Sequence, residues 1–501
     1  MRPLSCLCLV LALLAPAAAP AQNLPQAEDP YYRDAAAMLA AKLAAQPNIR
    51  TAKNVILFIG DGMGISTITA ARIYGGQKAG RDGVSNKLNM ETLPYGALSR
   101  TYSHDSQVTD SAPSATAMTT GIKTINDVLG VSATVKMGDC ASARSSEVRT
   151  IFELAERAGL ATGIVTTTRV THATPAAAYA HSADRDWETD ATMPAVAKAG
   201  GCLDIAQQLV RWPYGDGFEI IFGAGRDRLT PITLADPEYP NARGLRTDGR
   251  NLIEEWQRRY NDSAYVWNKA GFDALNLRPG RHVLGLFDRG DMQYEADRAK
   301  DPGGEPSLAE MTAKAIAGLS QDTDGFILMV EGARIDHAHH AGNAARALED
   351  ALAFDSAVAT ARALTSAEDT LIVVTADHSH VLTISGYPSR NNPILGKVDD
   401  VGGKMVLAGD GKPFTTLGYA NGPGAARNDM PRENISLLDT AALDFKQQAL
   451  VPFGGETHGG EDVAIFSGGP WAHLFSGVVD QQFIYHVIAH ATGIPARAAA
   501  R

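Results

Sequence analysis

The residue with the clearest catalytic potential is Ser111, in the segment 108–117 (VTDSAPSATA). Pro113 has a fixed φ angle and no N–H group, so it suits the first turn of a helix, and this helix would place Ser111 at its N-terminus. Free backbone N–H groups and the helix dipole favour an anion there, so the serine would meet a phosphate that is already partly neutralised. The alternative is an ordinary N-cap formed by Asp110 or Ser111.

Histidine and acidic residues gather further along the chain in a pattern that suits metal binding. In the segment 331–340 (EGARIDHAHH), Asp336 and His340 are four residues apart and would share one face of a helix that begins near Ile335. Both side chains could then reach one metal ion. His339, three residues after Asp336, would do nearly as well, so the spacing leaves the choice of histidine open.

Two more segments extend this pattern. Asp377 and His378 are adjacent, His380 follows two positions later, and His458 lies in a glycine-rich stretch (GGETHGG) that permits close approach of the backbone. A single histidine is usually structural, but three groups of His and Asp residues at one edge of a sheet indicate a metal site. The sequence therefore predicts a metal site built from these segments.

Strands are expected to position most of these residues. Residues 54–60 (NVILFIG) form a continuous apolar run, which is typical of a strand buried on both faces. Similar runs occur at residues 163–167, 325–330 and 370–375. Asp61, Glu331 and Asp377 follow three of these strands within two positions. Because ligands bind at the carboxyl ends of strands in open α/β sheets, the strand ends are expected to form one site.

Helical patterns at residues 308–319 and 344–364 alternate with the strands. This alternation predicts an α/β protein with a mainly parallel sheet covered by helices. Residues 384–452 are rich in Gly, Pro and Asn and predict an insertion or small subdomain. Strand character returns at residues 462–466, and residues 481–492 have the pattern of a closing helix.

The composition is that of a packed globular protein. Of the 501 residues, 45% are hydrophobic and 20% are charged, which excludes general disorder. The formal net charge of −11 argues against non-specific binding to nucleic acid, which needs a basic surface. An anionic substrate would need local cations at its site.

Residues 1–21 have the pattern of a secretory signal peptide. Arg2 provides a positive start, residues 4–14 are apolar, and small residues precede Gln22. The apolar run is too short to span a bilayer, and neither a later segment nor the C-terminus offers a membrane anchor. We therefore expect an exported protein, periplasmic or extracellular, whose residues 22 to about 50 form a peripheral helical arm.

The cysteine positions agree with export. Cys6 and Cys8 lie in the signal segment, so Cys140 and Cys202 are the two that the mature chain would keep. An oxidising compartment favours a disulfide over two free thiols, although the spacing by itself does not establish the bond.

Six segments, in order and across nearly all of the mature chain, resemble the alkaline phosphatase family. They are GDGMG, DSAPSATA, THATPAAAYAH, EGARIDHAHH, TADHSH and ETHGGEDVAIF. The histidine-rich segments are more similar to the animal-type branch than to the enteric-bacterial type. The resemblance implies a catalytic domain over residues 22–501, folded as a three-layer α/β/α sandwich around a large, mostly parallel sheet, with residues 384–452 as a crown-like insertion. It also implies a homodimer that hydrolyses small-molecule phosphate monoesters.

The resemblance further implies two zinc ions and one magnesium ion. The matching ligands are Asp336, His340 and His458 for the first zinc, Asp61, Asp377 and His378 for the second, and Asp61, Thr174 and Glu331 for the magnesium. Three histidines that support these ligands would be His172, His337 and His380. The donor atoms of these residues suit the implied metal ions, because zinc binds nitrogen and carboxylate ligands, whereas magnesium prefers oxygen ligands.

Catalytic roles follow from the same resemblance. Ser111 matches the nucleophile that forms a phosphoserine intermediate, and Arg185 matches an arginine whose planar guanidinium grips two phosphate oxygens. Two metal ions about 4 Å apart can stabilise the attacking and leaving oxygens of an in-line displacement. Without the resemblance, Arg185 would be interpreted as a surface ion pair with Asp184 or Asp186.

Animal-type members also carry a calcium-type site and a disulfide. The calcium site is matched by Glu238, the carbonyl of Phe287, Asp288 and Glu305, and the disulfide by Cys140 and Cys202. Oxygen ligands of this kind suit Ca²⁺, and the alternative is a solvated acidic surface.

Three other functions compete with this interpretation. Residues 111–115 resemble the sulfatase signature, but that signature requires an arginine where this chain has Ala115. A zinc phosphodiesterase of the same superfamily would use the same two metal ions, and Arg185 argues for monoesters instead. A non-catalytic phosphate- or metal-binding protein would have no need of Ser111.

Overall fold

The computed structural model describes residues 24–427 and 430–501. The predicted signal peptide, residues 1–21, lies outside these residues. Within the described part of the chain, no helix combines the length and the apolar character needed to cross a membrane.

The chain divides into two units, the first ending at Pro47 and the second covering Asn48–Arg501. The first contains a 3₁₀ helix, η1 (Pro25–Glu28), and the helix α1 (Pro30–Ala44). Asp29 caps α1 by accepting a hydrogen bond from the backbone N–H of Tyr31 at 2.8 Å. None of the residues of α1 is buried, so this helix contributes nothing to the core of its own unit.

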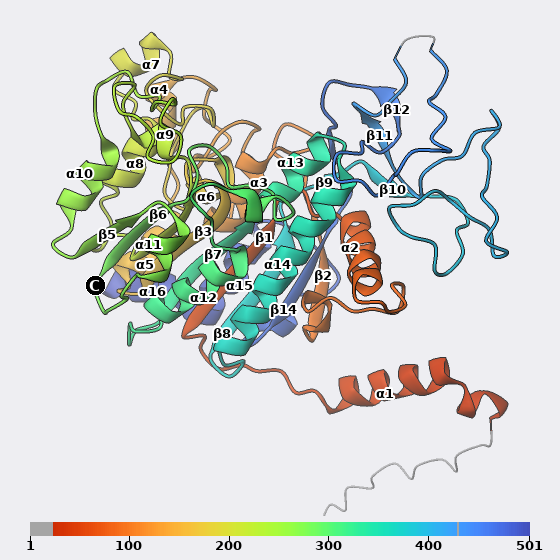
Figure 1. Cartoon of the computed structure of the whole chain (residues 1–501). Helices are drawn as coiled ribbons and strands as arrows, with labels where there is room; N and C mark the ends of the chain where they lie inside the picture. The colour runs from red at the N-terminus through yellow and green to blue at the C-terminus, as the bar shows by residue number, and fades with distance from the viewer. Residues whose placement is uncertain (1–23, 428–429) are drawn as a thin grey trace, which may run out of the picture. The chain divides into compact units, whose positions relative to one another are not determined.

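The second unit is built on a ten-stranded sheet with the order β15-β2-β14-β8-β1-β7-β3-β4-β6-β5 (Figure 1). Its strands are β1 (Asn54–Gly60), β2 (Tyr95–Arg100), β3 (Ala161–Arg169), β4 (Ile220–Ala224), β5 (Ser263–Val266), β6 (His282–Leu286), β7 (Phe326–Gly332), β8 (Thr370–Ala376), β14 (Val463–Gly468) and β15 (Val478–Asp480). Among these described strands, β14 alone runs antiparallel to its neighbours. The predicted mainly parallel sheet is confirmed.

Helices cover both faces of the sheet, because successive side chains of each strand point to opposite faces. In β1, Val55, Leu57 and Ile59 enter one hydrophobic core, and Ile56 and Phe58 enter the other. The first core is covered by α3 (Ser111–Thr120), α5 (Ile151–Arg157), α8 (Ile205–Arg211), α10 (Leu252–Arg259), α15 (Phe483–Thr492) and α16 (Ile494–Ala500). The second core is covered by α2 (Ile65–Lys78), α11 (Lys269–Asp273), α12 (Leu308–Leu319), α13 (Arg334–His340) and α14 (Ala344–Leu364). These three layers confirm the predicted α/β/α sandwich.

The bounds of α12 and α14 agree with the sequence pattern because capping residues mark their starts. Ser307 and Glu310 form a capping box at α12, and Asn343 caps α14 through the backbone N–H of Arg346 at 3.0 Å. Both helices lie across the near side of the sheet in Figure 1.

Two expected boundaries differ from the structure. β7 continues through Glu331 to Gly332, because its pairing with β1 extends to Gly60, so Glu331 belongs to the strand rather than to the turn after it. The predicted closing helix ends at Thr492 as α15, but it is not the last one. Gly493 turns the chain with φ 65°, and α16 follows.

Residues 384–452, predicted to be an insertion, contain few regular elements. β10 (Leu382–Ile384), β11 (Leu417–Gly422) and β12 (Ala449–Pro452) form a separate three-stranded sheet, at the upper right of Figure 1. A small two-stranded sheet of β9 (Ser379–His380) and β13 (His458–Gly459) joins two of the predicted ligand segments.

Shorter helices occupy the connections. They are α4 (Cys140–Ser146), α6 (Ala173–Ala176), α7 (Ala195–Ala199), α9 (Arg226–Leu229), η2 (Met90–Thr92), η3 (Arg298–Lys300) and η4 (Ala472–Leu474). Cys140 and Cys202 form the predicted disulfide, with Cα atoms 5.6 Å apart.

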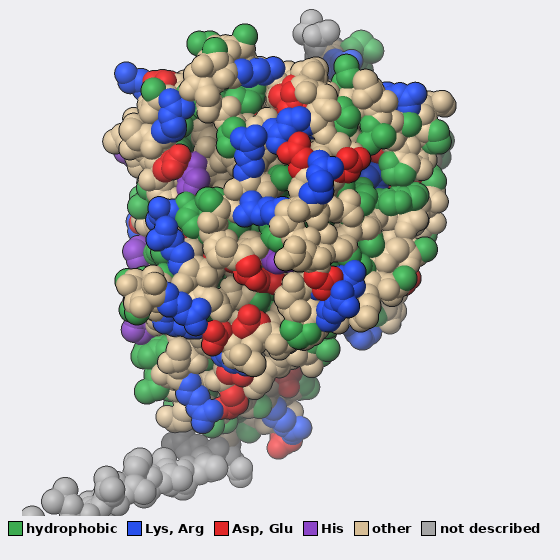
Figure 2. Space-filling view, turned by 90° about the vertical axis from the view of Figure 1, so that its left-hand side faces the viewer, with side chains coloured by type: hydrophobic (Ala, Val, Ile, Leu, Met, Phe, Trp, Pro, Cys, Tyr) green, Lys and Arg blue, Asp and Glu red, His purple; other side chains and the backbone are tan. Residues whose placement is uncertain are grey.

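On the face around β5 and the end of the sheet, acidic and basic side chains are interspersed rather than separated (Figure 2).

Candidate active site

The carboxylates of the predicted site meet at the carboxyl ends of the central parallel strands. Strand pairing aligns the last residue of β1 with the last residues of β7 and β8. Asp61 and Asp377 follow directly, and Glu331 is the penultimate residue of β7. All three side chains are fully buried, so their negative charges face one another away from water.

Ser111 is the first residue of α3, as predicted. Asp110 is the N-cap, and its Oδ1 accepts a hydrogen bond from the N–H of Ala112 at 2.7 Å. The hydroxyl of Ser111 is therefore not needed for capping, and it lies 3.3 Å from Nε2 of His378. Every residue of α3 is buried, which explains the run of small side chains in this segment.

The first set of candidate ligands, the acidic group, consists of Asp61, Asp377 and His378, whose ligand atoms lie within 4.8 Å of one another. Nε2 of His378 is 3.4 Å from Oδ1 of Asp61 and 3.3 Å from Oδ2 of Asp377. Both carboxylate oxygens of Asp61 are buried without a hydrogen-bond partner among the described residues. Burial and the charge of Asp377 raise the pKa of Asp61 well above its usual range. An ionised Asp61 thus requires a cation from outside the chain.

The second set, the oxygen group, consists of Asp61, Glu331 and Thr174. Oε1 of Glu331 and Oγ1 of Thr174 are buried and lack partners within the described chain. Burial, together with neighbouring carboxylates, raises the pKa of Glu331 to about 8. His172 also brings a ring nitrogen within 4.8 Å of carboxylate oxygens of Asp61 and Glu331. An oxygen-rich set of this kind fits a hard cation such as Mg²⁺.

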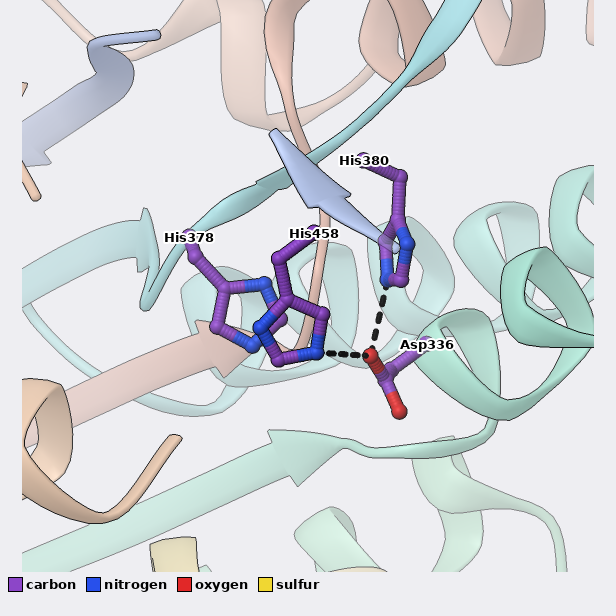
Figure 3. A group of neighbouring side chains, drawn as sticks. All are labelled: Asp336, His378, His380 and His458. Carbon is purple, nitrogen blue, oxygen red and sulfur yellow. Dashed lines mark hydrogen bonds and ion pairs between the residues drawn. The ribbon is translucent and has the colours of Figure 1, made fainter. Parts of the chain in front are cut away.

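The third set, the histidine group, consists of Asp336, His340 and His458. Oδ1 of Asp336 is 3.2 Å from Nε2 of His340 and 3.5 Å from Nε2 of His458, and the two ring nitrogens are 3.1 Å apart. Nδ1 of His458 donates to the carbonyl of Thr109 at 2.9 Å, which leaves its Nε2 facing Asp336 (Figure 3). One carboxylate and two imidazole nitrogens converging in this way fit a zinc ion.

The structure also distinguishes between His339 and His340. His339 is fully buried, and its two ring nitrogens form hydrogen bonds with Thr67 Oγ1 at 3.0 Å and with the hydroxyl of Tyr419 at 2.8 Å. Both nitrogens are therefore occupied away from Asp336. Within α13 it is therefore His340, four residues after Asp336, that approaches the carboxylate of Asp336.

His380 lies beside the histidine group and contacts a residue that the sequence analysis did not single out. Nε2 of His380 donates to Oδ1 of Asp336 at 2.7 Å, as Figure 3 shows, and Nδ1 donates to Oε2 of Glu456 at 2.5 Å. Burial opposes the charge of His380, but these two carboxylates outweigh it and raise its pKa to about 10. The only signal for Glu456 in the sequence is its position two residues before His458.

Arg185 is part-buried and does not form the surface ion pair considered above. Its Nη1 donates to Oδ1 of Asp110 at 2.8 Å, and its Nη2 donates to Nε2 of His172 at 3.1 Å. Since burial and the charges of Arg169 and Arg185 lower the pKa of His172 well below its usual value, His172 is neutral and can accept this bond. The arginine is thereby held next to the N-terminus of α3.

His337 connects the oxygen group to a second charged network. Its ring packs edge-to-face on that of His172, with centroids 5.7 Å apart, and its Nδ1 is 2.7 Å from Nη1 of Arg334. Asp291, another residue without a sequence signal, lies 3.6 Å from Arg334 and also forms an ion pair with Arg169 at 2.7 Å.

The predicted calcium ligands are brought together in part. Glu238 and Asp288 place oxygens within 4.8 Å of each other, and Asp301 completes the cluster. Asp301 was not predicted, although both of its oxygens are buried without a partner among the described residues. Burial and the charge of Asp301 raise the pKa of Glu305 to about 9, but Glu305 is not among the carboxylates whose oxygens lie within 4.8 Å of one another. The backbone of Phe287, at the end of β6, directly precedes Asp288.

The sequence matches the model of the alkaline phosphatase family over residues 52–494. It is 47% identical over 478 residues to the tissue-nonspecific alkaline phosphatase of Felis catus, which covers 94% of this chain and 90% of that protein. The corresponding human isozyme is also 47% identical over 478 residues, with the same coverage. The isozyme of Gallus gallus is 49% identical over 453 residues, or 89% of this chain and 86% of that protein.

Solved structures are similar in fold. The alkaline phosphatase of Thermus thermophilus superposes with a TM-score of 0.63 at 24% identity, covering 90% of this chain and 93% of that one. The alkaline phosphatase of the Antarctic bacterium TAB5 has a TM-score of 0.60 at 23% identity, covering 89% and 99%.

Proposed function

This chain belongs to the alkaline phosphatase family, and from that premise we propose how its own residues divide the work of the reaction. The chain is a metal-dependent phosphomonoester hydrolase that works through a phosphoserine intermediate. One observation carries the assignment of residues: buried carboxylate oxygens that lack partners within the described chain lie beside a serine at a helix N-terminus.

Ser111 is the proposed nucleophile. Its Oγ attacks phosphorus, the bond from phosphorus to the alcohol oxygen breaks, and the alcohol leaves. Water then attacks the phosphoserine, restores the hydroxyl and releases phosphate. The positive end of the α3 dipole favours the negative charge of the phosphate throughout. The N–H of Ala112 is already bonded to Asp110 and Pro113 has no N–H, so this contribution comes from the helix dipole rather than from a set of free N–H groups.

Two zinc ions and one magnesium ion are the proposed cofactors. The histidine group and the acidic group would each hold a zinc ion, and the oxygen group would hold magnesium. Support comes from the unpartnered oxygens of Asp61, Glu331 and Asp377 and from the convergence of His340 and His458 on Asp336. When bound, these ions supply positive charge that stabilises the attacking and leaving oxygens.

Arg185 is the proposed phosphate-binding residue. Asp110 and His172 hold two of its nitrogens, and Asp110 directly precedes Ser111 in the chain. A guanidinium fixed there can donate to two non-bridging oxygens of a monoester. A diester offers one fewer charged oxygen, so this arginine favours monoesters.

We further propose a calcium site, a homodimer and export. Glu238, the carbonyl of Phe287, Asp288 and Glu305 are the calcium ligands of this proposal, supported by the clustering of the carboxylates of Glu238 and Asp288 with that of Asp301. Large apolar side chains stand exposed in the crown-like segment 384–452, including Tyr387, Val401 and Leu437, and would be covered by a second copy.

The disulfide between Cys140 and Cys202 supports a periplasmic or extracellular location.

Hydrolysis of p-nitrophenyl phosphate, its bis-ester and its sulfate, measured side by side at alkaline pH, tests the proposal. We expect monoester turnover that stops on chelation and returns with zinc and magnesium. Preference for the diester would reassign Arg185. Absence of turnover with metals bound would place the chain among phosphate- or metal-binding proteins.

A further inference from the structure

We propose that Glu456 is a positioning residue for the histidine group, because it orients His380 and His340 toward Asp336. The inference rests on the proposed zinc site and adds a residue to it. Glu456 is only 2% exposed and lies in the loop between β12 and β13, two residues before His458.

The side chain of Glu456 forms two hydrogen bonds, one with each carboxylate oxygen. Oε2 accepts from Nδ1 of His380 at 2.5 Å, and Oε1 accepts from the backbone N–H of Val381 at 2.7 Å. The carboxylate therefore fixes both the ring of His380 and the backbone that follows it. With Nδ1 held in this way, Nε2 of His380 points at Oδ1 of Asp336, 2.7 Å away.

The backbone of Glu456 holds the second histidine. Its carbonyl accepts from Nδ1 of His340 at 2.5 Å, and its N–H donates to the carbonyl of His340 at 2.9 Å. One residue thus sets the orientation of two rings, from α13 and from β9. In both cases the bond at Nδ1 leaves Nε2 on the side of Asp336.

Hydrogen bonds of this kind matter for a metal centre because they fix the tautomer and the ring orientation of the neighbouring histidines. Removal of the partner of a ligating histidine typically weakens metal binding about 10- to 100-fold. The side chain of Glu456 acts one bond further out, through His380 on the ligand Asp336. Asp336 is the carboxylate that His340, His380 and His458 share, so misorientation of His380 would also move the ligand itself.

The same loop has a second anchor that offers a matched control. Asn421, in β11, accepts from the backbone N–H of Thr457 at 3.0 Å and donates to its hydroxyl at 2.9 Å. These bonds hold Thr457, whose hydroxyl donates to the backbone carbonyl of His458 at 3.3 Å, but they contact no histidine ring. Asn421→Ala would therefore loosen the loop and leave both histidine hydrogen bonds to Glu456 in place.

The experiment measures zinc release from the metal-loaded protein into a chromogenic chelator, together with the zinc content and the melting temperature. Glu456→Ala removes the bond to His380 and keeps the backbone bonds to His340. We therefore expect one of the two zinc ions to leave about 10-fold faster than in the wild type, the lower end of the range for lost partners of a ligand, with the other unchanged. The zinc release rate of Glu456→Gln should lie between those of the wild type and Glu456→Ala, since an amide of the same size can still form a hydrogen bond with His380. Asn421→Ala should lower the melting temperature and leave both release rates near those of the wild type.

Wild-type release rates in Glu456→Ala would overturn the inference, and so would equal acceleration of the same ion in Asn421→Ala, which would reduce Glu456 to a loop anchor. If Glu456→Ala fails to fold, the release rate of Glu456→Gln decides. If the wild-type protein binds no zinc, the proposed zinc site itself is refuted. This outcome is distinguishable from failure of the role of Glu456, because it is seen in the wild type before any substitution is made.

Discussion

Two regions of this protein bury several charged side chains, and they balance the charge in opposite ways. At the carboxyl ends of β1, β7 and β8, fully buried carboxylates face one another, and both oxygens of Asp61 lack a partner in the described chain. In the layer around α8 and α9, fully buried arginines are surrounded by acids. Arg246 pairs with Asp204 at 2.9 Å and with Asp248 at 2.5 Å.

In the arginine region, the buried arginines find their counter-charges within the chain. Arg226 makes a two-bonded pair with Asp236, both contacts at 3.0 Å, and also donates to the carbonyl of Leu286 at 3.0 Å. Breaking such a pair leaves an uncompensated buried charge. Buried acids that pair with an arginine are thus balanced within the chain, whereas the cluster of buried acids around Asp61 has no such partner and needs a cation from solution.

The largest effect is expected at Ser111, where chemistry and charge balance can be separated. Ser111→Ala removes the nucleophile but none of the carboxylates, so we expect the protein to keep its metal ions and lose at least about 10³-fold in turnover. Zinc content and hydrolysis of p-nitrophenyl phosphate check this. Full turnover in this variant would contradict the covalent mechanism.

A pair of isosteric substitutions tests the comparison directly. Asp204→Asn should lower the free energy of unfolding by about 3 kcal/mol whether or not metal is bound, because Arg246 loses a buried counter-charge. Asp61→Asn should lower the melting temperature of the metal-loaded protein but raise that of the chelated protein, since it removes an uncompensated carboxylate. Thermal melts with and without chelator measure both effects. A shift of the same sign for Asp61→Asn in both states would show that the charge of Asp61 is not balanced by a bound metal ion.

Asp350, in α14, represents a third way to bury an acid. Its oxygens accept only the backbone N–H of Glu295, at 3.2 and 3.3 Å, in the described structure, and burial raises its pKa to about 8. Because the folded-state pKa exceeds the unfolded-state value, the protonated acid is favourable at low pH, and stability is lost as pH rises toward 8. Between pH 5 and 7 this loss amounts to about 2–3 kcal/mol.

Asp350→Asn removes that dependence. We expect the melting temperatures of the two proteins to converge as pH falls toward 4, and the metal-loaded variant to exceed the wild type at pH 8. Parallel pH profiles for the two proteins would show that Asp350 is ionised in the folded state.

The smallest effect is expected at Arg185. Its charge is balanced within the chain by Asp110, and in the proposed function it also binds the phosphate of the substrate. Arg185→Ala should raise the inhibition constant of inorganic phosphate about 10- to 100-fold, corresponding to the loss of a charge-assisted pair. The melting temperature should change little in comparison. An unchanged inhibition constant would remove Arg185 from the phosphate site.

Local patterns in the sequence predicted the strands and helices from which the layers of this fold are built. The continuous apolar run at residues 54–60 coincides with β1, and the capped helices at residues 308–319 and 344–364 coincide with α12 and α14. These features depend on local patterns, namely burial on both strand faces and capping by neighbouring residues, so they could be derived without knowledge of distant contacts.

Which side chains meet depends on contacts between segments that are distant in the sequence. His339 and His340 are equivalent by spacing, and the contacts of His339 with Thr67 and Tyr419 turn it away from Asp336. Arg185 pairs with Asp110, 75 residues away, rather than with its acidic neighbours in the chain. Glu456 reaches His380 from another loop, 76 residues later. Such pairings depend on the order of strands in the sheet and on the rotation of each helix, which no local pattern of residues specifies.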